Sequence, residues 1–353
     1  MEQNQTPHKR RVRYSGTHPK RFEEKYKELN PEKYADDVQR IIDKGHTPAG
    51  MHISIMVQEI LDFLNIQPGQ VGLDATLGYG GHTRAMLEKL QGNGHIYGLD
   101  VDPIESVKTE KRLRDAGYGE DIFTVRLQNF ADIDKVVKDT GRKLDFILAD
   151  LGVSSMQIDN PERGFSYKVD GPLDLRLNPH TGVSGAERLL ELNRQELTHM
   201  FIENADEPYA EQIANNIMKW RYMCKPIETT TALRECITEA LAFLPKYEQK
   251  EAIKKSCQRC FQAIRIDING EFDALYSFME KLPEVLAPNG RVAILTFHSG
   301  EDRLVKKAFQ TFQRQGIYSD VARDVIRPSA EECVRNSRAK STKMRWAIRS
   351  DLN

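Results

Sequence analysis

The sequence lacks the long apolar segments of membrane-spanning and secreted proteins. No run approaches the roughly 18 consecutive apolar residues of a membrane span. The first residues, MEQNQTPHKRRVRYSG, contain no apolar block of the kind found in a secretory signal. We therefore expect a cytoplasmic protein that does not enter a membrane. The basic, acid-poor start leaves an organelle transit peptide as an alternative, although it shows no apolar helical face.

Cysteine is scarce, and its pattern argues against a disulfide framework. The chain has five cysteines, an odd number without regular spacing, as is usual in a reducing compartment. Cys257 and Cys260 form a C-x-x-C pair, but the other three cysteines supply no second pair at the spacing of zinc ligands. We expect ordinary thiols and no metal site.

An excess of charge of either sign is also absent. The 51 basic and 52 acidic residues leave a net charge of −1, so the chain as a whole is not a basic nucleic-acid binder. Two segments differ from this average, namely residues 8–27 and 334–349, which are dense in Lys and Arg. They predict contacts with phosphate groups, with ordinary solvated chain ends as the alternative.

What the chain does contain is an alternation of short aliphatic segments and helix-sized segments. Strands are predicted at residues 71–77, 95–102, 123–130, 144–152 and 291–299. The first four are separated by segments long enough for a helix, which is typical of a parallel sheet with crossover helices. A helix over 54–66 is predicted before them. GIYSDVARDVI and KMRWAIR predict a closing pair of strands after them.

The gap between the fourth and fifth predicted strands is far longer than one crossover requires. Its periodic segments predict helices at 185–192, 194–204, 208–222, 230–243, 249–256 and 270–286. We therefore expect a basic extension over residues 1–50, a sheet domain over 51–159 and 269–353, and a helical insertion over 160–268. The string APNG predicts a turn before the fifth strand.

The carboxyl ends of the predicted strands carry polar and aromatic groups. In an open parallel sheet these ends lie together and bind the ligand. The first strand leads into LDATLGYGGHTRAML (73–87), a glycine turn that opens a helix. The other strand ends carry Asp100, Asn129 with Phe130, Asp150, and His298.

The spacing within the glycine turn indicates its ligand. A dinucleotide fingerprint would start at Gly78 and Gly80 but has Thr83 at the third glycine position, and no phosphate-loop lysine occurs before Lys89. Asp100 follows Gly78 at roughly the 20-residue offset at which an acid binds a ribose diol. These features indicate an adenosine cofactor, and D-x-x-x-G-x-G resembles the S-adenosylmethionine loop of Rossmann-like methyltransferases.

Asp150, in LADLGVSS, occupies the strand end where amino-group methyltransferases carry a short acidic or amide motif. An exocyclic amine conjugated to a base is a poor nucleophile. A carboxylate that accepts its N–H bond directs the nitrogen lone pair toward the methyl group and can take the proton. A helix cap is the alternative role for a single aspartate here.

Two further regions are dense in functional side chains. Residues 156–179, MQIDNPERGFSYKVDGPLDLRLNP, form a non-periodic loop that is long for a compact domain. FQAIRI and FHSGEDR place charged and imidazole groups at the ends of elements, and the alternative role for them is an ion-pair network between insertion and sheet. These groups are Arg265, His298, Glu301, Asp302 and Arg303.

Taken together, these strings resemble a known family, the N4-cytosine methyltransferases of small-subunit ribosomal RNA, of the RsmH or MraW type. The resemblance runs from about His52 to Arg349. It is carried in order by GYGGHT, GLDVDP, LADLGVSSMQIDNPERGFSYKVDGPLDLRLNP, DEPYAEQIANNI, CFQAIRIDINGE and APNGRVAILTFHSGEDRLVKKAF. It implies an α/β fold, a Rossmann-like class I methyltransferase sheet with an inserted all-helical domain that binds RNA.

The same resemblance implies the reaction and its partners. The cofactor is S-adenosyl-L-methionine, and the partner is 16S rRNA in the small ribosomal subunit. The substrate is a cytosine of the decoding centre, cytosine 1402, which must be presented unstacked because its amine is otherwise paired or shielded.

Carried over position by position, the resemblance also implies site residues. It places the donor against Gly80, Gly81, His82, Asp100, Phe130, Asp150 and Gln157, and Gly78 belongs to the same turn. We expect Asp150 to position the amine, with Ser154, Asp174 and Arg176 near the base.

The chain also departs from the family pattern. The usual DGTFGRGGH is DATLGYGGH here, with Tyr79 in place of an arginine, and FHSLEDR is FHSGEDR, with Gly300. Residues 1–50 form a basic head that many members lack. These differences suggest a paralogous branch. They leave open a different RNA or DNA amine as acceptor. An RNA-binding assembly factor that kept the fold and lost catalysis is a separate alternative, and the oligomeric state, including a homodimer, stays open.

Overall fold

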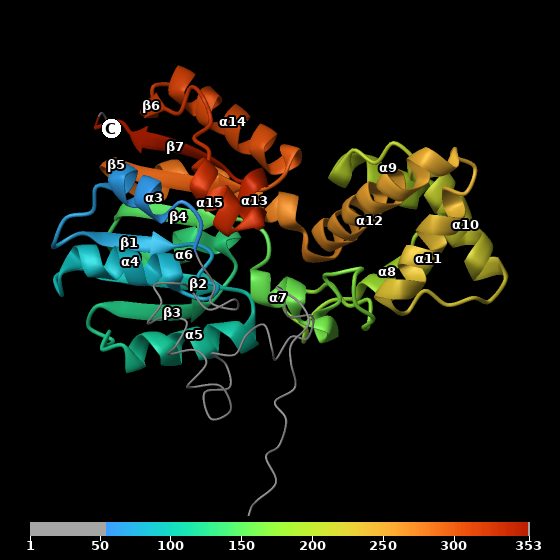
Figure 1. The fold of residues 1–353 in the computed structure, drawn as a ribbon. Coiled ribbons are helices and arrows are strands. Elements are labelled where there is room, and N and C mark those ends of the chain that lie inside the picture. Colours follow the sequence, from blue (N-terminus) through green and yellow to red (C-terminus); the bar gives the residue numbers. More distant parts are fainter. Residues whose placement is uncertain (1–53, 352–353) are drawn as a thin grey trace, which may run out of the picture. The chain divides into compact units, whose positions relative to one another are not determined.

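The computed structural model describes residues 54–351, so the predicted basic extension lies outside the described residues. This part of the chain contains a seven-stranded sheet of order β3-β2-β1-β4-β5-β7-β6 (Figure 1). The strands are β1 (Val71–Asp74), β2 (His95–Asp100), β3 (Phe123–Leu127), β4 (Leu144–Asp150), β5 (Leu286–Thr296), β6 (Tyr318–Val321) and β7 (Lys343–Arg349). The strands β1 to β5 pair in parallel, and β7 is antiparallel to both β5 and β6. The predicted α/β class and the closing strand pair are confirmed.

The first four strands end earlier than predicted, because the chain leaves the sheet at its polar residues. After β1, the N–H of Ala75 donates to the carbonyl of Leu148, and that of Leu77 donates to the carbonyl of Leu99. The segment that follows β1 therefore crosses the ends of β4 and β2 as a loop. This brings the glycine turn against the carboxyl ends of both neighbouring strands.

Strand β5 begins at Leu286, before the predicted turn at APNG, but its pairing with β4 is interrupted there: Leu286 pairs with Leu144 and Arg291 with Phe146, so this string bulges out of the ladder. The strand accommodates it as an irregularity: the register against β4 shifts between Leu144 and Phe146. Asn289 takes a left-handed φ of 60°, which asparagine tolerates better than most residues.

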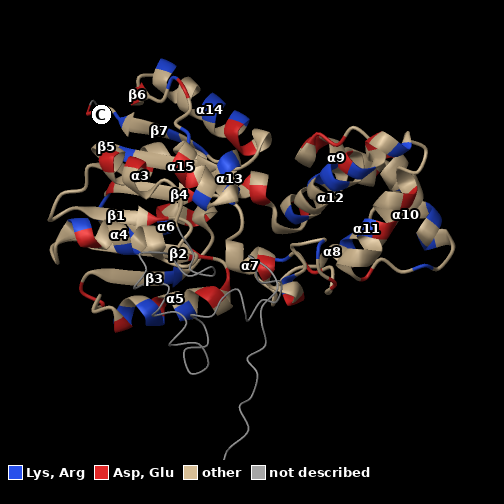
Figure 2. Ribbon diagram, viewed as in Figure 1, with Lys and Arg blue, Asp and Glu red and all other residues tan. Residues whose placement is uncertain are grey.

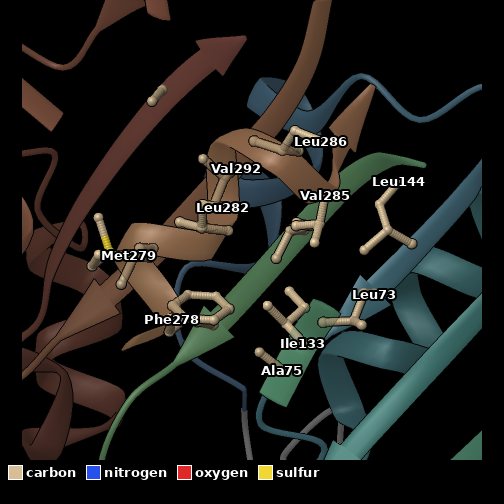
Figure 3. Close-up of a cluster of buried hydrophobic side chains, with 14 of the residues drawn as sticks. Leu73, Ala75, Ile133, Leu144, Phe278, Met279, Leu282, Val285, Leu286 and Val292 are labelled. Carbon is tan, nitrogen blue, oxygen red and sulfur yellow. The ribbon is translucent and has the colours of Figure 1, made fainter. Parts of the chain in front are cut away.

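Helices cover both faces of the sheet with separate apolar cores. These helices are α3 (Val57–Leu64), α4 (Gly81–Leu90), α5 (Pro103–Asp115), α6 (Ile133–Thr140), α13 (Glu271–Val285) and α14 (Ser299–Arg314). One core contains side chains of α6, α13 and α14, and the other those of α3, α4 and α5. In the first, Phe278, Leu282 and Val285 of α13 pack with Leu73 and Ile133 (Figure 3). Burial of each such side chain stabilises the fold by about 1.5–3 kcal/mol.

Within the long connection between β4 and β5, the five helices from α8 to α12 have a core of their own. They are α8 (Gly185–Glu191), α9 (Arg194–Ala205), α10 (Ala210–Tyr222), α11 (Thr230–Ala240) and α12 (Lys246–Asn269). Capping boxes begin α8 at Ser184 and α9 at Asn193, which satisfies backbone N–H groups of the first turn. The helical character of this segment is confirmed. The division of the chain into three domains stays a prediction.

The predicted helix over 249–256 is too short, because α12 continues to Asn269. Its buried residues Cys257, Cys260, Phe261 and Ile264 recur at helical spacing, although charged neighbours obscure the pattern. Burial raises the pKa of the Cys257 thiol to about 12, as expected of an ordinary packed thiol. No group of side chains among residues 54–351 has the composition of a metal site.

The basic segment 334–349 has mostly structural contacts. It includes part of the short helix α15 (Ala330–Arg335), the 3-10 turn η4 (Ser337–Ser341) and β7. Five of its six cations meet partners within the chain: Arg335 with Glu331, Arg338 with Asp159, Lys343 and Arg345 with Asp302, and Arg349 with the carbonyls of Pro283 and Ile317. Such pairing leaves little charge for the phosphate contacts that the sequence predicts here.

Exposed helices carry mixed charges and not a single-sign surface. On α5, Lys and Arg alternate with Asp and Glu (Figure 2) and form ion pairs one turn apart, including Lys111 with Asp115. Within residues 54–351 we find no helix with the length and apolar character needed to cross a membrane.

Candidate active site

The glycine turn is fixed at its base by a buried aspartate. Asp74, the last residue of β1, accepts a hydrogen bond from the Thr83 hydroxyl at 2.7 Å and from the Thr76 N–H at 3.1 Å. These bonds join the end of the strand to the first turn of α4. Gly80 begins α4 with a φ of +82°, and a Cβ there would lie 2.6 Å from Thr109 Cγ2. The chain therefore needs glycine at this position.

Replacing Gly80 by alanine is expected to lower the free energy of unfolding by more than the roughly 1–2 kcal/mol that a left-handed backbone costs an L-residue. The excess comes from the contact with Thr109. Gly141 is the matched control, because it has a φ of +66° but open space around an added Cβ. Denaturant unfolding of Gly80→Ala and Gly141→Ala measures the difference, and equal losses would contradict the steric argument.

Asp100, at the end of β2, connects the glycine turn to the second strand. Its Oδ2 accepts the N–H of Gly78 at 2.9 Å, and its Oδ1 accepts the N–H of Asp102 at 2.9 Å. Burial raises the pKa of the Asp100 carboxyl to about 6, and the two backbone N–H groups offset this only in part. The carboxylate thus lies in a dry position beside the turn.

Asp150 ends β4 on the other side of the same turn. Its backbone N–H donates to the Thr76 hydroxyl, and its Oδ2 lies 3.6 Å from Nδ1 of His82. Its Oδ1 is buried and has no hydrogen-bond partner among the described residues. Burial raises the pKa of the Asp150 carboxyl to about 6, which His82 partly offsets. The side chain as a whole keeps 22% of its surface exposed, while Oδ1 itself is buried and has spare acceptor capacity.

The His82 ring is held from both sides. Its Nε2 donates to the carbonyl of Ile55 at 2.8 Å, and its Nδ1 faces Asp150. Phe130 lies in the 3-10 turn η2 (Phe130–Asp132) after β3, where its ring packs edge-on against Phe278. The structure therefore brings His82 and Asp150 together at the turn and puts Phe130 at the neighbouring strand end.

Ser154 is the N-cap of the short helix α7 (Ser155–Asp159), and it forms a capping box with Gln157 in the first turn of that helix. The Ser154 hydroxyl accepts the N–H of Gln157, and Oε1 of Gln157 accepts the N–H of Ser154. Nε2 of Gln157 donates to Oδ2 of Asp102 at 2.9 Å. Gln157 thus joins α7 to Asp102, just after β2, and the Ser154 hydroxyl is engaged in capping α7.

Asp174 and Arg176 pair with each other. Nε of Arg176 donates to Oδ1 of Asp174 at 2.7 Å, and a second bond joins Nη2 to Oδ2 at 3.0 Å. Hydrogen bonding to Asp174 raises the pKa of Arg176. Neither side chain has a recorded contact with Asp150, so their predicted proximity to the base stays a prediction.

The charged groups predicted at element ends form separate ion pairs, and the pair of Arg303 with Asp206 joins α14 to the end of α9 in the insertion, as the alternative role requires. His298 caps α14 and lies 3.1 Å from Glu301, while Arg303 of the same helix pairs with Asp206 at the end of α9. The remaining pairs are Arg265 with Glu271, which connects α12 to α13, and Asp302 with Arg345. Arg265 lies inside α12 and not at its end, since that helix is longer than predicted.

Tyr79 and Gly300, the two residues that depart from the family pattern, both contact aromatic or charged side chains or lie close to them. The Arg112 guanidinium lies 3.8 Å from the centroid of the Tyr79 ring, so an arginine still borders the turn. A Cβ on Gly300 would lie 2.7 Å from Phe272 and 3.2 Å from the His298 ring. A larger residue at 300 would therefore require both rings to move.

Sequence reasoning missed the residues that connect the site from within, chiefly Thr83, Asp102 and Arg163. Asp102 precedes a proline at the start of α5 and accepts the N–H groups of Ile104 and Glu105. An aspartate before a proline at a helix start is a recognisable cap signal. No comparable signal identifies Arg163, whose partners lie far along the chain.

An open parallel sheet with an antiparallel seventh strand, a glycine turn after β1 and carboxylates ending β2 and β4 define a Rossmann-like methyltransferase. The chain belongs to the MraW methylase family, whose model matches residues 49–350. This confirms the predicted enzyme class and S-adenosylmethionine as the donor.

Three relatives illustrate the similarity. Ribosomal RNA small subunit methyltransferase H 1 of Agathobacter rectalis is 66% identical over 344 residues, 98% of each chain. Ribosomal RNA small subunit methyltransferase H 2 of Alkaliphilus metalliredigens is 59% identical over 350 residues, 99% of this chain and 100% of that protein. Ribosomal RNA small subunit methyltransferase H of Kosmotoga olearia is 38% identical over 301 residues, 84% of this chain and 97% of that protein. The first two matches include most of residues 1–50.

Proposed function

We propose that this protein methylates the N4 amine of a cytosine in 16S rRNA of the small ribosomal subunit, in the cytoplasm. The proposed target is cytosine 1402 of the decoding centre. The observation that carries the proposal is Asp150, a carboxylate with an unsatisfied oxygen at the end of β4, beside the glycine turn. The names of the relatives, which are small-subunit rRNA methyltransferases, support the substrate class.

The residues at the glycine turn fit an S-adenosylmethionine donor. Helix α4 begins at Gly80 without a side-chain cap, so the N–H groups of its first turn, from Gly81 and His82, can donate to a carboxylate. Asp100 has carboxylate lone pairs for a ribose diol, and Phe130 offers an apolar face. Because the His82 ring is already engaged, we assign its contact to the backbone.

Asp150 has the properties that an amine acceptor needs. The donor supplies an electrophilic methyl group on a sulfonium. Asp150 would accept one N–H of the cytosine amine, which orients the nitrogen lone pair, and would take the proton as the N–C bond forms and the bond from the methyl carbon to the donor sulfur breaks, leaving a neutral thioether. A pKa raised to about 6 makes this carboxylate a stronger base than an ordinary one, yet it remains ionised near neutral pH.

Turnover is expected to fall as the pH is lowered through about 6, because protonated Asp150 no longer accepts the amine N–H. Above that value turnover should level off. Asp100 has a similarly raised pKa, so kcat must be measured at saturating donor, with donor affinity determined separately at each pH. A kcat that stays constant from pH 8 to pH 5 would contradict the role of Asp150.

The helical insertion is proposed to bind the RNA. It has its own core, and two tyrosines on its helices are strongly exposed, Tyr222 at 91% and Tyr247 at 82%. Exposed aromatic rings suit stacking with unpaired bases. The sheet domain, 51–159 and 269–353, is then the catalytic part, and residues 160–268 are the substrate part.

A labelled methyl donor distinguishes the proposed acceptor from its alternatives. Purified protein is incubated with labelled S-adenosylmethionine and, in parallel, with unmodified small subunits, DNA or free cytidine. We expect label on the small subunit alone. Label on DNA or cytidine alone would contradict the proposal, and RNA binding without donor binding in calorimetry would indicate a non-catalytic assembly factor.

A further inference from the structure

We propose that Arg163 is a positioning residue that fixes the loop Leu173–Leu177 to the donor side of the site. The loop carries the Asp174–Arg176 pair. The inference rests on the proposed function for what binds on each side. Arg163 belongs to the 3-10 turn η3 (Pro161–Arg163) and is only 7% exposed.

On the donor side, Arg163 pairs with a carboxylate next to Asp100. Its Nη1 donates to Oδ2 of Asp102 at 2.8 Å, and the same oxygen accepts Nε2 of Gln157. Oδ1 of Asp102 caps α5, and the N–H of Asp102 donates to Asp100. Burial acts to raise the pKa of Asp102, but Arg163, Gln157 and the N–H of Glu105 together outweigh it, so the pKa is lowered. This end of Arg163 is therefore anchored in the rigid end of β2.

On the other side, the same guanidinium holds the backbone of the loop. Its Nη2 donates to the carbonyls of Arg176 at 3.1 Å and Leu177 at 2.9 Å. The carbonyl of Arg163 also accepts the N–H of Leu175 at 3.1 Å. One buried side chain thus reaches both the β2 end and the loop.

The loop needs such support because its conformation is unfavourable. Leu175 is buried and has a φ of 64°, in the left-handed region that a branched side chain disfavours. Asn269, the last residue of α12, forms two further hydrogen bonds with the loop: it accepts the N–H of Leu177 and donates to the carbonyl of Leu175. These bonds orient the Asp174–Arg176 pair between the sheet and the insertion.

An arginine is required because the two sides need separate donors. A guanidinium offers donors in a planar fork, whereas a lysine ammonium is a compact charge that satisfies one side at a time. In Arg163→Lys the ammonium should remain with Asp102, since a buried carboxylate cannot be left unpaired. The loop carbonyls then lose their partner.

The test compares Arg163→Lys with Arg114→Lys in the full chain. Arg114 is a matched control, because it also joins two backbone carbonyls, those of Tyr118 and Phe123, to one carboxylate, that of Glu110, and none of these partners belongs to the glycine turn. For Arg163→Lys we expect kcat/KM for small subunits to fall about 100-fold, the size of loss that a 1 Å misplacement produces. Affinity for S-adenosylhomocysteine, measured by calorimetry, should stay within about threefold, because the ammonium still pairs with Asp102 and the bond from Asp102 to Asp100 remains. Arg114→Lys should change neither quantity.

A second readout does not depend on RNA. In the wild-type protein, S-adenosylhomocysteine should slow hydrogen exchange at residues 173–177, because the donor side and the loop share Arg163. In Arg163→Lys this slowing should disappear although the ligand still binds. If Arg163→Lys does not fold, Asn269→Ala takes its place in the test, because it loosens the same loop without leaving a buried charge. The same fall in kcat/KM is then expected.

The outcomes separate the inference from the proposed function. Equal ligand-induced protection of residues 173–177 in wild type and Arg163→Lys would overturn the positioning role, as would equal kcat/KM for Arg163→Lys and Arg114→Lys. A wild-type protein that binds S-adenosylhomocysteine but labels no small-subunit cytosine would contradict the proposed function instead. The exchange experiment would then still decide the role of Arg163.

Discussion

Replacing Asp150 by asparagine is expected to lower kcat by about 100- to 10,000-fold, the range that a positioned proton acceptor contributes. Asparagine keeps the size of the side chain and one acceptor oxygen, but it does not take the proton and carries no charge. Donor affinity should change much less than kcat, because we propose that the glycine turn and Asp100 supply the main contacts with the donor. Single-turnover methylation of small subunits and calorimetry with S-adenosylhomocysteine measure the two quantities.

Asp145→Asn is the matched control for this substitution. Asp145 lies on the same strand but at its other end, where its carboxylate accepts the N–H of Val71. We expect wild-type kcat for this variant. If Asp150→Asn lost donor affinity as much as kcat, Asp150 would belong to the donor site and not to the amine.

Replacing Asp100 by alanine is expected to weaken donor binding by about 10- to 100-fold. A hydrogen bond to a charged group contributes about 1.5–3 kcal/mol, and about 1.4 kcal/mol corresponds to tenfold in affinity. The substitution also removes the acceptor that holds the N–H of Gly78, so the turn itself loses an anchor. Titration calorimetry with S-adenosylhomocysteine measures the effect.

The control for Asp100 is Asp115→Ala, which removes an exposed carboxylate at the end of α5 that pairs only with Lys111 among the described residues. We expect its donor affinity to equal that of the wild type. Equal affinity of Asp100→Ala and wild type would refute the assignment of Asp100 to the donor.

The candidate site was predictable as far as it depends on topology. Parallel strands end at one edge, so Asp100 and Asp150 could be placed together from strand order alone, and the structure ties both to the turn through Gly78 and Thr76. The α/β sheet followed in the same way from the alternation of apolar and helical segments. These inferences need only local patterns and a general rule of sheet construction.

The parts that could not be predicted depend on contacts between distant residues. Arg163 and Asp102 are 61 positions apart, and nothing in either local sequence indicates the other. The cations of β7 resembled a nucleic-acid-binding segment, yet Arg345 pairs with the buried Asp302. Likewise, α12 continued through a polar stretch because its apolar residues meet the core of the insertion. Tertiary packing, and not local propensity, decided these three cases.

The substrate contacts assigned to Ser154, Asp174 and Arg176 remain predictions. Each has a partner within the chain that accounts for its position, a capping box for Ser154 and a mutual ion pair for the other two. A residue with a structural contact can still touch the substrate. Their substitution effects on KM for small subunits, compared with kcat, decide between the two roles.

The central claim is that this chain places a methyl group on N4 of a decoding-centre cytosine. The most direct measurement is nucleoside mass spectrometry and position mapping of 16S rRNA from small subunits incubated with S-adenosylmethionine and either wild-type protein or Asp150→Asn. The account predicts N4-methylcytidine at cytosine 1402 with the wild-type protein and a strongly reduced amount with the variant. A methyl group on another nucleotide, or on an atom other than N4, would contradict it.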